Sequence, residues 1–188
     1  MKKVAVLFAN GFEEVEALTV VDYLRRVSLH VDMVSIGDEK NVKGASGVEV
    51  IADKLLDEII GSIDYDCVVL PGGLPGSTNL RKDERVIDYI RKMDEANKYV
   101  AAICAAPIVL HRAGLTAKAK ITSYPGVEKQ MKGIDYSEDI VTVDKNIVTS
   151  RGPATAVLFA LKLAELLTDE QTARGLKEQI LFPLISDL

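Results

Sequence analysis

The chain contains few of the residues that build disulfide frameworks and metal centres. Its 188 residues include two cysteines, Cys67 and Cys104, and two histidines, His30 and His111. In a reducing compartment, two free thiols are the default for such a pair of cysteines. Because no Cys or His cluster is present, a structural zinc site is not expected, and nothing indicates a nucleotide, flavin or metal cofactor.

Excess positive charge and long apolar runs are also missing. The formal net charge is −5, and no basic stripe marks a surface for nucleic acid. No segment approaches the roughly 18 apolar residues of a membrane span. The apolar run at 4–8 is too short for the core of a signal peptide, and acidic residues follow it. We therefore expect a cytoplasmic protein with no nucleic-acid or membrane partner.

Short apolar runs alternate with segments of helical spacing along the whole chain. Because strands that alternate with helices form mostly parallel sheets covered on both faces, we predict an α/β fold. The length suits one domain covering residues 1–188. Strands are predicted at 4–8, 32–36, 67–70, 99–103, 120–123, 140–143 and 147–150, a hairpin or pair of edge strands at 40–52, and helices from 15 to about 26 and at 84–95, 105–113, 153–167 and 168–179.

Several turn-forming or chemically reactive segments come directly after predicted strands. In sheets of this kind, ligands bind outside the carboxyl ends of the strands. We therefore expect these segments to converge at one edge of the sheet. They are Asn10-Gly11, Pro71-Gly72-Gly73, Cys104 and Ser150-Arg151-Gly152.

Cys104 lies where a buried strand is predicted to run straight into a helix. The small residues Ala102 and Ala106 flank it at the spacing of a hydrolase nucleophile elbow. Pro107 suits the first turn of a helix, so Cys104 is placed just ahead of a helix N-terminus, where the dipole favours a thiolate. A lone cysteine beside a strand is ordinarily an inert core residue. The elbow context reverses that expectation for Cys104, but not for Cys67.

Chemistry at a thiolate also needs hydrogen-bond donors for a developing oxyanion. Backbone N–H groups of Gly72, Gly73 and Ala105 can supply them, although the two glycines alone indicate only a tight turn. A histidine base is poorly available. His111 lies about two helical turns, roughly 10 Å, beyond Cys104, and His30 opens the second predicted strand at the opposite end.

Carboxylates are therefore the remaining candidates for the partner of the thiol. Glu13, Glu14 and Glu16 open the first predicted helix, where acidic residues commonly complement the helix dipole. That interpretation is preferred for Glu13 and Glu14. Glu16 falls between apolar residues at the expected helix–sheet boundary. A carboxyl buried beside a thiolate has a raised pKa and, when protonated, can donate a hydrogen bond to sulfur.

Four motifs together resemble the ThiJ/PfpI superfamily, and within it the branch of the human parkinsonism-associated protein deglycase and its bacterial relatives. They occur in the family's order and span nearly the whole chain, which makes the combination highly specific although Pro-Gly-Gly alone is weak. They are Asn10-Gly11-Phe12-Glu13-Glu14-Val15-Glu16, Val69-Leu70-Pro71-Gly72-Gly73, Ala102-Ile103-Cys104-Ala105-Ala106-Pro107 and Thr149-Ser150-Arg151-Gly152-Pro153-Ala154-Thr155.

The resemblance implies a flavodoxin-like three-layer sandwich, a homodimer and no cofactor. It places Glu16 rather than Glu14 against Cys104, implies an easily oxidised thiol, and surrounds the sulfur with backbone groups of Gly72, Gly73 and Ala105. Many relatives carry a histidine near the cysteine, where this chain has Tyr124. Tyr124, Ser150 and Arg151 are possible substrate contacts. Tyr124 is equally consistent with a partly buried ring over the site, and surface ion pairs are the default for Arg26 and Arg151.

Three functions remain open at this level. The first is an enzyme that uses Cys104 and Glu16 on reactive α-oxoaldehydes or on early glycation adducts of amines and thiols, protecting the cell from stress. The second is a redox sensor or redox-regulated chaperone that works through oxidation of Cys104. A cysteine peptidase or amidase ranks below both because no histidine is placed as its base. A homodimer is further expected because Val15, Leu18, Val21 and Tyr23 give the first helix more apolar surface than one sheet face needs.

Overall fold

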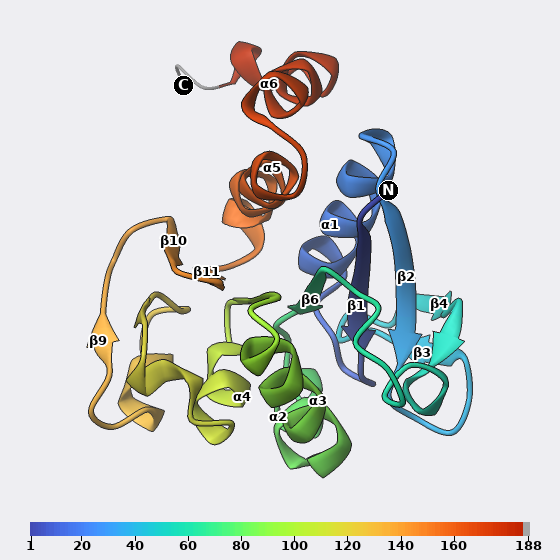
Figure 1. Ribbon diagram of the computed structural model, residues 1–188, viewed down its shortest axis with the longest axis vertical. Helices are drawn as coiled ribbons and strands as arrows, with labels where there is room; N and C mark the ends of the chain where they lie inside the picture. Colours follow the sequence, from blue (N-terminus) through green and yellow to red (C-terminus); the bar gives the residue numbers. More distant parts are fainter. Residues whose placement is uncertain (186–188) are drawn as a thin grey trace.

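The computed structural model describes residues 1–185 as an α/β structure around a seven-stranded sheet (Figure 1). The strands are ordered β10-β11-β7-β6-β1-β2-β5, and every neighbouring pair is parallel except β10 and β11. Without the edge strands β10 and β5, the chain order is 2-1-3-4-5, which is the flavodoxin-like order. The strands span Lys3–Phe8 (β1), His30–Ser35 (β2), Lys54–Leu55 (β5), Cys67–Leu70 (β6), Tyr99–Ile103 (β7), Val141–Asp144 (β10) and Ile147–Ser150 (β11).

Helices cover both faces of this sheet, so its central strands are buried on both sides. In β6, Val68 and Leu70 pack into one apolar cluster, whereas Cys67 and Val69 pack into the other, as the twofold alternation of a strand requires. The predicted three-layer sandwich is therefore confirmed. One layer contains α1 (Glu14–Arg26), α5 (Ala156–Leu167) and α6 (Glu170–Gln179), and the other contains α2 (Gly76–Lys82), α3 (Glu84–Glu95) and α4 (Pro107–Arg112).

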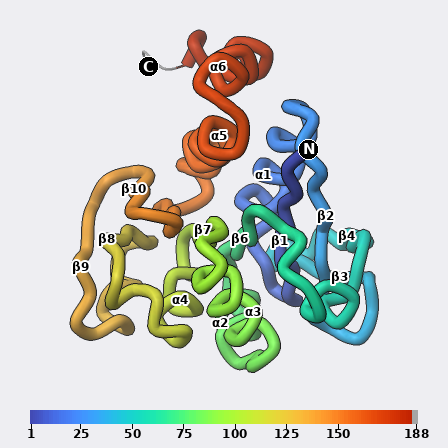
Figure 2. The backbone as a smooth tube through the Cα atoms, viewed as in Figure 1, coloured from blue at the N-terminus to red at the C-terminus, as the bar shows by residue number. Residues whose placement is uncertain are grey.

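Two small sheets flank the main one on opposite sides (Figure 2). The expected hairpin at 40–52 is confirmed as the antiparallel pair β3 (Asn41–Lys43) and β4 (Glu49–Ile51), which stands apart from the main sheet. The strand predicted at 120–123 is shorter and lies outside the main sheet. It is β8 (Lys120–Ile121), and it pairs in parallel with β9 (Asp135–Tyr136).

Some helix boundaries differ from the predictions for local reasons. The helix predicted at 105–113 begins only at Pro107, because residues 104–106 form the turn that leaves β7. The one predicted at 153–167 starts as a 3-10 turn and becomes α5 at Ala156. Helix α2 carries too few apolar residues for its periodicity to be seen in the sequence. Within residues 1–185, no helix is long and apolar enough to cross a membrane.

Candidate active site

Cys104 occupies a sharp turn directly after β7. Its backbone φ is +64°, in the left-handed region that non-glycine residues rarely adopt. Its N–H donates to the Ser150 carbonyl at 3.0 Å, and its own carbonyl accepts the Tyr124 N–H at 2.9 Å. Ala102 and Ala106 are fully buried beside the turn, as the elbow spacing predicts. The fold therefore holds the backbone of Cys104 in a strained conformation, which ordinarily costs about 1–3 kcal/mol.

Glu16 lies in the first turn of α1, fully buried, with its carboxyl beside the thiol. Its Oε2 accepts the Gly72 N–H at 2.8 Å. Its own backbone N–H donates to the Glu13 carboxylate at 2.7 Å, so Glu13 is the N-cap of the helix that carries Glu16. Sequence reasoning gave Glu13 only a dipole role and missed this capping contact, although an acidic residue just before a helix is its usual signal.

Residue 72 must be a glycine because the Cys104 side chain and the Glu16 carboxyl both pack against it. A Cβ at this position would overlap Oε2 of Glu16 and lie 2.6 Å from Cβ and 3.1 Å from Sγ of Cys104. Gly73 has a φ of +88°, and the backbone N–H groups of Gly73 and Ala105 stabilise the sulfur as an anion. The structure thus brings together the five residues Cys104, Glu16, Gly72, Gly73 and Ala105.

The thiol and the carboxyl share their protons. Burial, with a smaller contribution from the charge of Glu13, raises the pKa of Glu16 to about 7, although hydrogen bonds from Cys104 and Gly72 oppose the shift. Burial and the neighbouring Glu16 charge raise the pKa of Cys104 to about 12, against the backbone donors of Gly73 and Ala105. Because the two groups titrate as a pair, the pair holds one proton and one negative charge between these values. A thiolate beside a protonated carboxyl is one arrangement of that state.

The pKa of Cys104 is raised overall, although the sequence predicts nearby N–H groups and a helix dipole that favour the thiolate. Helix α4 begins three residues later and contains only six residues. Burial and the Glu16 charge outweigh the backbone N–H groups of Gly73 and Ala105, which favour the anion. The negative charge at the sulfur is therefore set by the shared proton with Glu16 rather than by the helix.

The three possible substrate contacts differ in accessibility. Tyr124 is 50% exposed and its ring packs on Gly152, where a Cβ would lie 3.2 Å from the ring. Arg151 donates to the Glu138 carbonyl at 2.7 Å and, within residues 1–185, pairs with no carboxylate, so the expected ion pair is not seen. Ser150 is fully buried, and its hydroxyl bonds to Ile140 and Thr155. A substrate contact by its side chain does not fit that position.

Other candidate groups lie outside the site. Glu14 is buried but its Oε1 accepts the Ser46 N–H at 2.7 Å, so it fastens the β3–β4 hairpin rather than facing the thiol. His111 bonds through Nδ1 to Thr116, and His30 bonds through Nε2 to Asp32. Arg26 forms the expected surface pair with Asp22. No group of three or more potential metal ligands occurs in the described part of the chain.

Comparison with known proteins agrees with this geometry. The model of the DJ-1/PfpI family matches residues 2–166. Protein dj-1beta of Drosophila melanogaster is 38% identical over 181 residues, covering 93% of this chain and 96% of the relative. A Schizosaccharomyces pombe protein named glutathione-independent glyoxalase DJ-1 is 30% identical over 192 residues, covering 97% and 100%.

A solved structure has the same architecture. Oxidized DJ-1 of Toxoplasma gondii superimposes with a TM-score of 0.93 at 37% identity, covering 96% of this chain and 98% of that one. The matched family segment contains Cys104, Glu16 and the Gly72-Gly73 turn. On this evidence the chain belongs to the DJ-1/PfpI family.

Proposed function

We propose that this protein is a cysteine-dependent enzyme that converts reactive α-oxoaldehydes, or their early adducts with amines and thiols, into hydroxy acids. The observation that carries the proposal is the contact between Cys104, held at a φ of +64°, and the buried carboxyl of Glu16, which share one proton above pH 7. The glyoxalase name of the Schizosaccharomyces pombe relative supports the same substrate class.

The chemistry follows from the shared proton. The Cys104 thiolate attacks the aldehyde carbon, forming a carbon–sulfur bond, and the carbonyl oxygen takes the proton of Glu16. With an early adduct, the thiolate displaces the amine or thiol from the same carbon, and the departing group takes the Glu16 proton. The Glu16 carboxylate then removes the hydrogen of that carbon as a proton and returns it to the adjacent keto carbon, while the hydroxyl proton on the former aldehyde oxygen passes to the keto oxygen, which gives a thioester of a hydroxy acid. Water hydrolyses the thioester and frees the thiol. Backbone N–H groups of Gly73 and Ala105 are available beside the sulfur, where negative charge develops, whereas the Gly72 N–H, expected as a third donor, is instead bonded to Oε2 of Glu16.

Purified protein with methylglyoxal provides the test. We expect lactate to form with wild-type protein and not with Cys104→Ser. Equal lactate formation by both proteins would contradict the proposal. A lysine-derived early adduct of methylglyoxal, assayed after free methylglyoxal has been scavenged, separates action on adducts from action on the free aldehyde.

A redox role is the second candidate, favoured by the partial exposure of Cys104 beside N–H donors that stabilise a charged sulfur. In this role peroxide oxidises Cys104 in steps, and the oxidation state regulates chaperone activity. Intact mass after mild peroxide should show two added oxygens on Cys104 before Cys67 reacts. Oxidation of Cys67 first would rule this role out.

A peptidase or amidase function stays lowest because the described residues place no histidine beside Cys104.

The homodimer remains a prediction, with less exposed apolar surface on α1 than the sequence suggested, because Val21 is buried in the core. Val15 is 52% exposed, and Leu18 and Tyr23 are half-buried. A monomeric mass by light scattering at micromolar concentration would contradict the homodimer. The cytoplasmic location also stays a prediction.

A further inference from the structure

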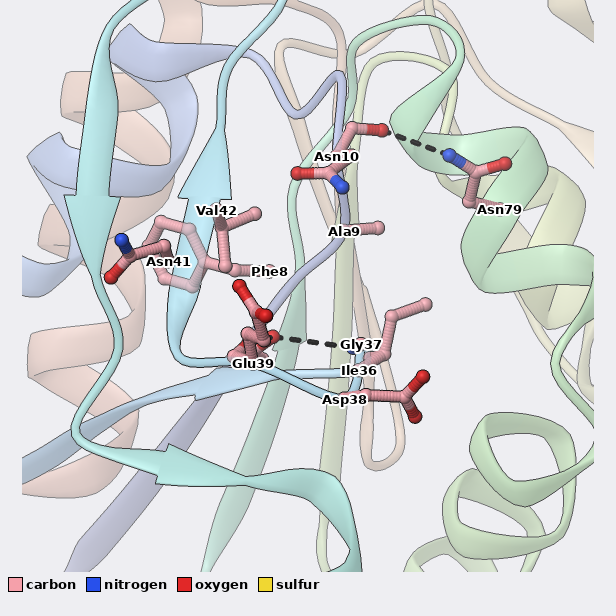
Figure 3. Close-up of a pocket in the computed structure, with 11 residues that line it drawn as sticks. Phe8, Ala9, Asn10, Ile36, Gly37, Asp38, Glu39, Asn41, Val42 and Asn79 are labelled. Carbon is pink, nitrogen blue, oxygen red and sulfur yellow. Dashed lines mark hydrogen bonds between the residues drawn. The ribbon is translucent and has the colours of Figure 1, made fainter.

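A cavity of about 420 Å³ opens at the carboxyl ends of β1 and β2 (Figure 3). It is separate from the Cys104 site, which lies at the ends of β6 and β7 on the other side of β1. None of Cys104, Glu16, Gly72 or Gly73 lines it. Its volume falls within the range of about 300–1,000 Å³ that is usual for small-molecule sites, and its position is the edge of an α/β sheet where ligands bind.

The cavity joins an apolar floor to a polar rim with no cationic side chain. Phe8, Ala9, Ile36 and Val42 supply the apolar part. The polar side chains that line the cavity are the Ser35 hydroxyl, two carboxylates and three amides, the last five being Asp38, Glu39, Asn10, Asn41 and Asn79. A negatively charged ligand would therefore meet two carboxylates and no compensating Lys, Arg or His, so anions are disfavoured here.

Hydrogen bonds fix the orientation of two of the amides, and each amide keeps one polar group that is not used in those bonds. Asn10 accepts the Lys43 N–H through Oδ1 at 2.9 Å, so its NH₂ group remains a donor. Asn79 donates through Nδ2 to the Asn10 carbonyl at 2.9 Å, so its Oδ1 remains an acceptor. Because these partners set which way each amide points, Asn10 presents an oriented donor to the cavity, whereas the Asn79 oxygen points away from it in Figure 3.

The carboxylates of Asp38 and Glu39 have no hydrogen-bond or ion-pair partner among residues 1–185. The loop that carries them is held by the Ser35 hydroxyl, which donates to the Glu39 carbonyl at 2.7 Å. The neighbouring cation Lys40 turns to other groups, donating to the Asp53 carbonyl and lying 4.0 Å from Glu58. In Figure 3 the Glu39 carboxylate and the Asn10 amide face the same space, whereas the Asn41 amide turns away from it.

We propose that this cavity binds a small sugar with a vicinal diol, such as a ribosyl group, through Glu39 and Asn10. Hydroxyl groups both donate and accept, so they satisfy a carboxylate and an amide NH₂ together, whereas a cation would use only the acceptors. A carboxylate that follows the second strand of an α/β sheet is also the group that holds ribose hydroxyls in dinucleotide-binding folds. The apolar floor provides a surface for the face of the ring. The proposal does not depend on the chemistry at Cys104.

The full-length protein can be titrated with methyl β-D-ribofuranoside and followed by amide resonances in ¹H–¹⁵N NMR spectra. We expect saturable shifts at residues 36–39 and at the side-chain amides of Asn10 and Asn79. The 2-deoxy analogue should bind about fivefold more weakly or worse, because it lacks one hydroxyl of the diol. Glu39→Gln should weaken binding about tenfold, because it replaces a charged acceptor on an exposed loop.

Matched controls decide the location and the class of the ligand. Glu49→Gln removes an exposed carboxylate that does not line the cavity, so binding should be unchanged. Cys104→Ser should also bind normally, which separates this site from the proposed enzyme activity. Equal affinity for the two ribosides, tighter binding of putrescine, or shifts centred on residues 72–73 and 104–105 would each overturn the proposal. So would the absence of saturable shifts up to about 50 mM, where binding is negligible.

Discussion

Cys67 lies on β6 and Cys104 just past the end of the neighbouring strand β7, yet the two cysteines have opposite surroundings. Cys67 opens β6 and is fully buried, and among residues 1–185 its thiol has a single hydrogen-bond partner, the Val68 carbonyl at 3.8 Å. Burial raises the pKa of the Cys67 thiol, and the nearby Asp66 charge raises it further. Cys104 is also largely desolvated, but Gly73, Ala105 and Glu16 surround its sulfur. The two thiols therefore differ in the polar groups that accompany burial.

Sheet geometry explains the difference. Cys67 is at the amino end of its strand, whereas Cys104 lies just past the carboxyl end of β7. In a parallel sheet the loops that carry free N–H groups and helix starts meet at the carboxyl edge. The Gly72-Gly73 turn, which leaves the strand that Cys67 opens, reaches Cys104 and not Cys67.

The largest expected effect separates the two thiols directly. Cys104→Ser should lower the rate of lactate formation from methylglyoxal by about 10³-fold or more, because the nucleophile is removed. Cys67→Ser should leave the rate within about twofold. It should instead lower the free energy of unfolding by about 1–3 kcal/mol, because it buries a hydroxyl without a good partner. Steady-state assays and urea denaturation measure both quantities, and the reverse pattern would break the comparison.

Removing the shared proton tests whether Glu16 gives Cys104 its reactivity. Glu16→Gln should lower the rate by about 10²-fold or more, because proton transfer is lost. In wild-type protein, alkylation of Cys104 by iodoacetamide should rise as the pH increases through about 7, where the pair loses its first proton. In the variant that inflection should vanish. An unchanged inflection in Glu16→Gln would assign it to another group.

The same carboxyl makes a prediction about stability. Its pKa is raised from 4.5 to about 7 in the folded protein, so its protonated form is favoured by folding. The resulting stabilisation is complete below about pH 4.5 and is lost as the pH rises through 7, by on the order of 3 kcal/mol. The difference in free energy of unfolding between wild type and Glu16→Gln, from denaturation at pH 5 and pH 8, should therefore shift against the wild type at the higher pH. A constant difference would contradict a buried, raised-pKa Glu16.

The packing of Gly72 against Glu16 and Cys104 gives the next test, because Cys67 has no such contact with this turn. Gly72→Ala should lower activity by about 10²-fold, because its Cβ would displace Glu16 or Cys104 and small displacements of reacting groups have effects of that size. Gly175→Ala in α6 is the matched control, since nothing lies within 4 Å of its added Cβ. It should keep full activity and gain about 0.5–1 kcal/mol of stability.

The sequence was sufficient to predict the fold and the sharp turn that holds Cys104. Continuous apolar runs such as 67–70 showed strands buried on both faces, and the small residues around Cys104 predicted the elbow whose φ is +64°. Helix α2 could not be predicted because its buried positions include Gly76 and Ser77, which give no apolar period.

Side-chain partners were harder to predict than backbone positions. Ser150 occupies the expected strand end, but whether its hydroxyl faces the site or the Ile140 carbonyl depends on a contact ten residues away. The raised pKa of Cys104 was not predicted for a similar reason. The local signal, a helix start, is visible in the sequence, whereas the desolvation and the Glu16 charge that outweigh it arise from packing.

Substitution of Tyr124 should have the smallest effect on activity, and it tests whether a group other than Glu16 distinguishes Cys104 from Cys67. Its hydroxyl has no partner among residues 1–185, and its side chain is half exposed, so Tyr124→Phe should change kcat/KM for methylglyoxal by less than about fivefold. Tyr124→Leu, which also removes the ring that packs on Gly152, should have the larger effect, mainly on KM. A loss of about 10²-fold in Tyr124→Phe would make the phenol a proton donor. The contrast between Cys104 and Cys67 would then rest on Tyr124 as well as on Glu16.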